Sequence, residues 1–178
     1  MDNIVGFLAV AVALVALIVE TTRSRLTQQA DTLLRFADRY TAAPMRGTRR
    51  AAAKKLLAAK PFNDELSDVL DFFTLLALFV ERGAMDARLA YMTFDYWLLH
   101  YWQAAHEHIR SERQSDPKSW LRLDHLASRF QRMRRKEGLS AAIDGPSLRK
   151  FLVEESASSP ALMQSVRVRA KTLPVGRR

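Results

Sequence analysis

The sequence predicts an all-α protein in which a single N-terminal transmembrane helix is followed by a small helical bundle. Residues 4–19 form an uninterrupted apolar run, and apolar residues recur downstream at spacings of three and four, the period of an amphipathic helix. With 178 residues and 48% hydrophobic content, the chain can form a packed core. We expect four parts, namely a transmembrane anchor (1–22), a juxtamembrane helix (23–43), a cytoplasmic helical domain (44–155) and a flexible basic tail (156–178).

Composition and charge narrow the function classes. The chain has no cysteine, which excludes disulfides, thiolate chemistry and cysteine-ligated zinc or iron–sulfur sites. The net charge of +9 is unevenly distributed. Residues 20–60 and 129–178 are basic, whereas residues 61–128 hold more Asp and Glu than Lys and Arg. The basic segments indicate an anionic membrane surface or nucleic acid as possible partners.

The apolar run is the predicted membrane anchor. As a helix, residues 4–19 would rise roughly 24 Å at about 1.5 Å per residue, slightly less than the ~30 Å hydrocarbon core of a bilayer. A signal peptide and a buried core helix are the alternatives. The start Met1-Asp2-Asn3 lacks the basic region of a signal peptide. A helix that is apolar on every face is also unusual in the core of so small a domain.

The flanking charges predict the orientation of the anchor. Asp2 is the one charged residue before the run, whereas Arg23, Arg25, Arg35 and Arg39 follow it. Cytoplasmic flanks carry an excess of Lys and Arg. We therefore expect a single-pass protein of the cell inner membrane, with its N-terminus outside and its C-terminal domain in the cytoplasm.

The anchor helix should continue beyond the membrane, because no Pro or Gly interrupts residues 23–40. The apolar residues of this segment alternate spacings of four and three, as in a short heptad seam: Leu26, Ala30, Leu33, Ala37 and Tyr40. The seam either pairs with a second copy or packs on the chain's own domain, and we favour the second reading. Pro44 should then break the helix.

Residues 45–60 form a basic segment in which small and apolar residues are interleaved, as in an amphipathic helix. Near an anionic leaflet, each Lys or Arg contributes about 1 kcal/mol of attraction. Membrane docking is therefore the leading interpretation, ahead of a solvated basic face and of nucleic-acid binding. The expected contacts to lipid headgroups are Arg46, Arg49, Arg50, Lys54 and Lys55.

A second helix should follow Pro61, with Asn63 as its N-cap and Gly83 as its left-handed stop. Its apolar residues follow a helical period, and the stretch is too short to span a bilayer. We expect them to face the core: Leu66, Val69, Leu70, Phe73, Leu76, Ala77 and Val80.

The helix expected over residues 86–113 is dense in aromatic residues, and Asp86 can cap it. We expect one stripe to pack on the preceding helix, formed by Leu89, Met92, Tyr96, Leu99 and Trp102. Trp97 and Tyr101 lie at the edge of this stripe. They are therefore the candidates for a partner surface.

A further amphipathic helix should follow Asp116-Pro117 and end before Gly138. Its last turns are basic, which suits a helix C-terminus in itself. They are also the candidate nucleic-acid contacts: Arg129, Arg132, Arg134, Arg135 and Lys136. A short helix over residues 147–155 and the basic tail complete the chain.

No catalytic, cofactor-binding or metal-binding constellation stands out. His106 and His108 are about 200° apart on a helix, and His100 has no His or carboxylate three or four positions C-terminal to it, as a helical metal site requires. Glycines are scattered singly, without a phosphate-binding loop, and no nucleophile motif appears. We therefore expect a protein without metal or cofactor that is not an enzyme.

The order of features resembles an uncharacterised bacterial family of small proteins known as domain of unknown function 4760. The resemblance covers roughly residues 1–130 and lies in Phe72-Phe73, Glu81-Arg82-Gly83 with Asp86, Phe94, Tyr101-Trp102 and Arg113. It implies one N-terminal membrane helix followed by a helical cytoplasmic region. The family carries no activity that could be transferred.

The sequence thus favours a membrane-tethered, non-enzymatic interaction or scaffold module that holds a partner or a second copy at the cytoplasmic face. A membrane-tethered nucleic-acid-binding protein, using residues 46–60, 129–136 and the tail, is the alternative. A third possibility is an accessory subunit of a membrane complex, with the small residues of the anchor helix as contacts.

Overall fold

The computed structural model describes residues 2–58 and 64–157; for residues 2–16, 18 and 19 it describes the helical backbone alone. The described chain is all-α, as predicted, without strands. Its helices are α1 (Asp2–Thr41), α2 (Ala43–Leu57), α3 (Asp64–Glu81), α4 (Ala87–Ala104), α5 (His106–Glu112), α6 (Leu121–Lys136) and α7 (Gly145–Ala157).

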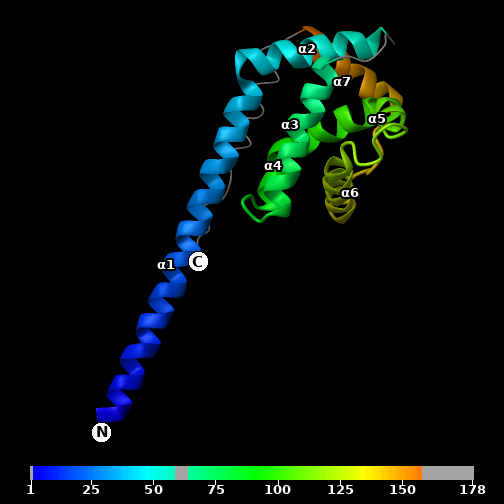
Figure 1. Cartoon of the computed structure of the whole chain (residues 1–178). Helices are drawn as coiled ribbons and strands as arrows, with labels where there is room; N and C mark the ends of the chain where they lie inside the picture. The colour runs from blue at the N-terminus through cyan, green and yellow to red at the C-terminus, as the bar shows by residue number, and fades with distance from the viewer. Residues whose placement is uncertain (1, 59–63, 158–178) are drawn as a thin grey trace.

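Helix α1 is a long rod whose C-terminal half alone belongs to the bundle (Figure 1). Every residue from 20 to 28 is exposed. The Gln29 side-chain amide then donates to the carbonyl oxygen of Gly83 (3.0 Å), and Leu33, Phe36 and Tyr40 are buried in the core. The rod therefore leaves the domain at about the level of the turn between α3 and α4.

Among the residues whose side chains are described, no helix is long and apolar enough to cross a bilayer. The run at residues 4–19, which we predict to be the anchor, lies outside those residues except for Leu17.

The elbow between α1 and α2 forms where the sequence predicts a break. Helix α1 ends at Thr41, Ala42 adopts extended backbone angles, and Pro44 occupies the first turn of α2. Pro suits this place because its missing N–H would have no helical acceptor there. Helix α2 consequently turns across the end of the bundle that is farthest from the N-terminus (Figure 1).

Helix α3 forms the centre of the core, and its apolar period is confirmed. All seven residues predicted to face the core are buried, as is Phe72. Gly83 adopts a positive φ of 70° after the helix, the left-handed conformation that Gly accepts without strain. Asp86 then caps α4 by accepting hydrogen bonds from the amides of Arg88 and Leu89. The predicted cap Asn63 lies outside the described residues.

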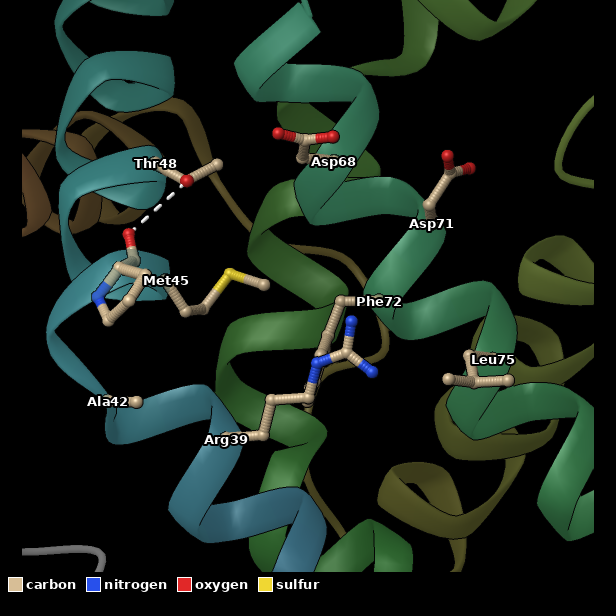
Figure 2. Close-up of a pocket in the computed structure, with 9 residues that line it drawn as sticks. Arg39, Ala42, Met45, Thr48, Asp68, Asp71, Phe72 and Leu75 are labelled. Carbon is tan, nitrogen blue, oxygen red and sulfur yellow. Dashed lines mark hydrogen bonds between the residues drawn. The ribbon is translucent and has the colours of Figure 1, made fainter.

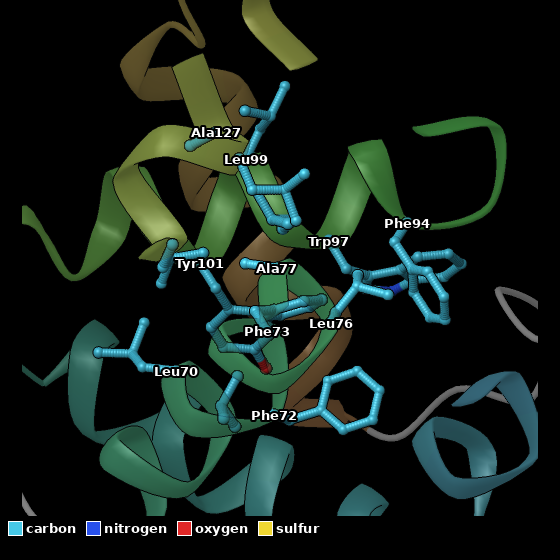
Figure 3. Packing of buried hydrophobic residues seen from close by; sticks show 14 of the residues in the cluster. Leu70, Phe72, Phe73, Leu76, Ala77, Phe94, Trp97, Leu99, Tyr101 and Ala127 are labelled. Atoms are coloured by element: carbon cyan, nitrogen blue, oxygen red, sulfur yellow. The ribbon is translucent and has the colours of Figure 1, made fainter. Parts of the chain in front are cut away.

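Helix α4 is more deeply buried than its sequence predicts, and the predicted core stripe is confirmed only in part, since Leu99 is buried. Met92 is 37% exposed, and Leu89, Tyr96 and Trp102 are only partly buried. The most buried face instead carries Ala90, Tyr91, Phe94, Trp97, Leu98 and Tyr101. Helices α1, α3, α6 and α7 all contact α4. Because α4 is covered on several sides, one periodic stripe does not identify all of its buried residues (Figure 3).

The helix predicted over residues 86–113 is interrupted at Ala105, between α4 and α5. Ala105 is fully buried and starts the next hydrogen-bonded turn by accepting from the Ile109 amide. Before α6, Trp120 has a positive φ of 50°, unusual for a large side chain. Its indole N–H donates to Asp71 of α3 (2.8 Å), which holds the turn against the bundle.

Helix α7 closes the domain. It starts where the Ser147 amide donates to the Asp144 carboxylate (2.6 Å), and it packs on α2 and α4. The predicted short helix over residues 147–155 is thus present, slightly longer at both ends. Of the predicted tail, residues 158–178 lie outside the described part of the chain.

We predict that Phe36→Ala lowers the free energy of unfolding by about 3–5 kcal/mol, as for a buried Phe. The ring is 7% exposed and packs edge-on against Phe72 (5.6 Å between centroids) and Phe79 (5.1 Å). Leu34→Ala is the matched control, because Leu34 is 54% exposed on the same helix. Urea unfolding measures both; equal losses would contradict the packing of α1 on the domain.

Candidate functional site

A buried polar cluster lies beneath α7. The Arg49 Nε atom of α2 is 3.3 Å from Oε2 of Glu155 on α7, and both residues are 7% exposed. The Tyr101 hydroxyl of α4 lies 3.0 Å from the same carboxylate oxygen, to which it donates. The guanidinium carbon of Arg49 also stands 4.0 Å above the ring of Tyr40 on α1. The ion pair and the two tyrosines around it thus connect four helices.

The charges of this cluster are confined to Arg49 and Glu155. Burial raises the pKa of the Tyr40 and Tyr101 hydroxyls well above their ordinary value, so both remain neutral. Burial opposes the charge on Arg49, but Tyr40 and Glu155 together hold its pKa above its ordinary value. A buried cation with one carboxylate is stable only while the carboxylate stays in place.

An aromatic site lies one helical turn away from the ion pair. The Phe151 ring of α7 is fully buried. Its centroid lies 4.7 Å from that of His100, 5.1 Å from that of Tyr101 and 5.5 Å from that of Tyr96. Helix α4 thus presents three rings that surround one ring of α7, an arrangement that stabilises beyond the area buried.

His100 is held neutral in this aromatic site. Burial lowers the pKa of its imidazole, and nearby Arg134 lowers it further, against the opposing effects of the Tyr96 carbonyl, Asp144 and Glu154. One ring nitrogen, Nδ1, contacts the carbonyl oxygen of Tyr96, one turn earlier in α4. The side chain therefore serves packing at neutral pH and would acquire a buried charge in acid.

A groove lies inside the elbow of α1 and α2 (Figure 2). This elbow groove has a volume of about 570 Å³, with Met45, Phe72 and Leu75 among its apolar lining. Arg39 reaches into it from α1, and Asp68 lines it from α3. Its other polar groups are engaged: the Thr48 hydroxyl donates to the Pro44 carbonyl (3.3 Å), and Asp71 accepts from Trp120. The groove offers a mixed surface without a concentration of reactive groups.

The prediction that Trp97 and Tyr101 form a partner surface is wrong. Trp97 is 7% exposed and packs edge-on against Tyr40 (5.5 Å between centroids), whereas Tyr101 is fully buried. Both lie among the core side chains of Figure 3. The physical reason is the depth of α4 in the bundle, since α1 covers one of the faces that the sequence leaves open and α7 covers another.

The predicted lipid contacts of α2 are divided by the fold. The prediction is wrong for Arg49, because its side chain points into the domain and pairs with Glu155. Lys55 is half-buried and pairs with Glu65 of α3 (3.3 Å). The remaining three, Arg46, Arg50 and Lys54, share the exposed face of α2, and Arg50 donates from Nε to the Ser156 carbonyl (3.2 Å).

The predicted nucleic-acid contacts of α6 are largely exposed. Arg134 is the exception, because it lies 3.3 Å from Asp95 of α4 and donates from Nε to the Ser140 carbonyl (2.8 Å). The other four lie on the face of α6 opposite its buried residues: Arg129, Arg132, Arg135 and Lys136. Within the described chain, no carboxylate stands within ion-pair distance of these four.

Metal-binding groups do not gather in the part of the chain that is described. There, no three His, Asp or Glu side chains come together as a metal site would need. What the cluster beneath α7 can hold is a carboxylate, through the Arg49 guanidinium and the Tyr101 hydroxyl, together with an aromatic ring.

Sequence reasoning missed Glu155, Phe151 and the inward direction of Arg49. One signal was present. Residues 148, 151, 152 and 155 follow the spacing of an amphipathic helix, so an acidic residue stands on the apolar face. A charge on an apolar face indicates a buried partner of opposite sign.

Comparison with known proteins identifies a family but no function. A family model described as a domain of unknown function (DUF4760) matches residues 3–130. No curated protein and no solved structure matches the chain. The matched residues include α1 to α5 and most of α6, and they exclude α7.

We predict strong coupling in a double-mutant cycle of Arg49 and Glu155. Either Arg49→Met or Glu155→Gln should lower the free energy of unfolding by about 3–5 kcal/mol, because each leaves a buried group without its partner. The double variant should lose far less than the sum of the two. Additive losses in urea unfolding would show that the two side chains do not interact.

The lowered pKa of His100 predicts a loss of stability in acid. As the pH falls through about 6.5, the ordinary pKa of His, the unfolded chain takes up a proton that the folded chain excludes. The free energy of unfolding therefore decreases in this range and levels off below the folded-state pKa. His100→Phe should flatten the profile between pH 7.5 and 5. His108→Gln should remove a further part of the pH dependence of stability, since burial also lowers the pKa of His108. An unchanged slope in His100→Phe would contradict this account.

Proposed function

The chain belongs to the DUF4760 family, and we propose that it is a membrane-tethered, non-enzymatic interaction module. In this proposal, residues 4–19 anchor the chain in the cell inner membrane with the N-terminus outside. The bundle then holds a partner or a second copy at the cytoplasmic face. The observation that carries the proposal is a continuous helix that leaves the bundle and leads into the apolar run.

The geometry of α1 supports the anchor. Its 40 residues give a rod of roughly 60 Å at about 1.5 Å per residue, more than twice the length of any other helix of the bundle. A helix that extends away from its bundle is costly to maintain in water unless its apolar part is buried elsewhere. Residues 20–28 leave the bundle and are all exposed, and the sixteen residues of the run before them carry no polar side chain.

The same geometry argues against lipid binding by α2. From residue 20 to Thr41, α1 rises roughly 32 Å at about 1.5 Å per residue. Arg46, Arg50 and Lys54 would therefore stand far above the bilayer that holds the anchor. Electrostatic attraction is screened over about 8 Å at physiological ionic strength. We accordingly assign the membrane attachment to the anchor alone.

The exposed basic face of α6 supports nucleic-acid binding as the alternative function. Arg129, Arg132, Arg135 and Lys136 are unpaired within the described chain, and phosphate contacts by such residues weaken steeply with salt. The discriminating measurement is fluorescence anisotropy with a short duplex DNA and an RNA at 50 mM and 200 mM salt. Failure to bind either at low salt removes this alternative. Binding that is lost at 200 mM salt and after Arg132→Glu supports it.

We predict that two charges within the apolar run release the protein from membranes. Each Lys at the centre of a transmembrane helix costs about 2.5–3.5 kcal/mol on insertion scales, so Val10→Lys with Leu14→Lys should abolish anchoring. Membranes of an expressing bacterium are washed with high salt and then with carbonate. The wild-type chain should stay in the pellet, and the double variant should appear in the supernatant.

The matched control for this experiment places the same charge beyond the run. Gln28→Lys lies on the exposed part of α1 and should remain in the pellet like the wild type. If the wild-type chain itself is removed by the washes, residues 4–19 do not anchor it. The proposal of a membrane-tethered module then fails.

A further inference from the structure

We propose that α2 and α4 form a docking groove for an amphipathic helix of a partner protein, in which an aromatic residue and a carboxylate stand one turn apart. Helix α7 is the chain's own occupant of this groove and is displaced when the partner helix binds. The inference rests on the proposed function, because it names the class of partner for that interaction module. The groove itself is tested without a membrane.

Helix α7 contacts the domain in the manner of a docked helical ligand. Its buried residues follow the spacing of helix-in-groove anchors, with Leu148 partly buried and Phe151, Leu152 and Glu155 buried. The opposite face is exposed, including Arg149, Lys150 and Val153. The contacts of α7 are therefore concentrated on one face, as expected of a helix that is bound by a groove.

Two complementary subsites define the groove. The first is formed by the aromatic rings of His100, Tyr96 and Tyr101, which surround the side chain of Phe151. The second is the Arg49 guanidinium with the Tyr101 hydroxyl, which receives the carboxylate of Glu155. Phe151 and Glu155 are four residues apart, so one helical turn matches the distance between the subsites.

The charge of Arg49 determines which helices fit. In the described chain, Glu155 is the one carboxylate within ion-pair distance of Arg49. Once α7 leaves, the guanidinium opens to solvent at the floor of an otherwise apolar and aromatic groove, and a helix that buries it again must supply an anionic partner. A partner helix with Asp or Glu at this place restores the ion pair, whereas a neutral helix does not.

Helix α7 is also separable from the rest of the domain. The segment between α6 and α7 covers residues 137–144, and most of its residues are exposed. Eight extended residues can span roughly 26 Å at about 3.3 Å per residue, so α7 can swing clear without disturbing α6. Helix α7 lies outside residues 3–130, the part that matches the family model.

The test uses the full chain in detergent with a site-specific protease sequence placed at residues 139–142. The folded protein is cut there and mixed with a fluorescein-labelled peptide of residues 143–157, and binding is followed by fluorescence anisotropy. We expect saturable binding to the cut protein and at least tenfold weaker binding to the uncut protein. Phe151→Ala or Glu155→Gln in the peptide, or Arg49→Met in the protein, should weaken binding at least tenfold. Val153→Ala in the peptide, on the exposed face, should bind like the wild type.

Three results would overturn the inference. The first is loss of the far-ultraviolet circular dichroism signal on cutting, which would make α7 an obligatory part of the fold. The second is a cut protein that stays folded and never exchanges α7 for the peptide. The third is a dimer of the uncut chain with exchanged α7 helices, which would replace the partner protein by a second copy. None of these results depends on membrane fractionation, so failure of the groove is distinguishable from failure of the anchor.

Discussion

Arg49 carries a full positive charge inside a small helical bundle, and the arrangement of four helices depends on how that charge is compensated. Removing a guanidinium from water costs on the order of several kcal/mol even after the surrounding protein relaxes, unless a counter-ion and further polar contacts replace the water. Glu155 from α7 supplies the counter-ion, Tyr101 from α4 donates to that carboxylate, and the Tyr40 ring of α1 lies against the cation. Arg49 itself belongs to α2. Loss of any one of these contacts would therefore destabilise the packing of helices that lie far apart in the chain. Such a cluster specifies one arrangement of α1, α2, α4 and α7 more than it adds to total stability.

The second constraint is the dual role of α1, which belongs to the core at one end and leaves it at the other. Leu33, Phe36 and Tyr40 join the aromatic core, whereas residues 20–28 are all exposed. A rod fixed at one end by core packing orients the whole bundle relative to whatever holds the other end. In the proposed function that support is a bilayer, and the rod keeps α2 and the groove beneath α7 well above the lipid headgroups. In the proposed orientation, a surface held there would be accessible to partners in the cytoplasm.

Local sequence signals predicted most of the fold, because helix period, caps and stops are local properties. The Pro44 break, the apolar face of α3, the Gly83 stop and the Asp86 cap are all confirmed. The candidate site was not predictable in the same way. A helix such as α4, contacted by several neighbours, has no single exposed edge, so Trp97 and Tyr101 were misplaced. Arg49 was likewise read as part of a basic surface, since its partner Glu155 lies 106 residues away and no local pattern connects the two. Most of the anchor and residues 158–178 of the tail lie outside the residues whose side chains are described, and for them the sequence remains the basis of prediction.

Hydrogen exchange of the full chain in detergent, followed by mass spectrometry, tests the central role of the Arg49 cluster most directly. Helices that depend on one buried ion pair should open together and at lower free energy than the apolar core. The account predicts that α7 exchanges faster than α3 in the wild type. It also predicts that Arg49→Met accelerates exchange most in α2 and α7, while the slowest amides of α3 accelerate only as much as the loss of global stability requires. Exchange of α7 at the rate of the slowest α3 amides, with equal acceleration of every helix in the variant, would contradict it.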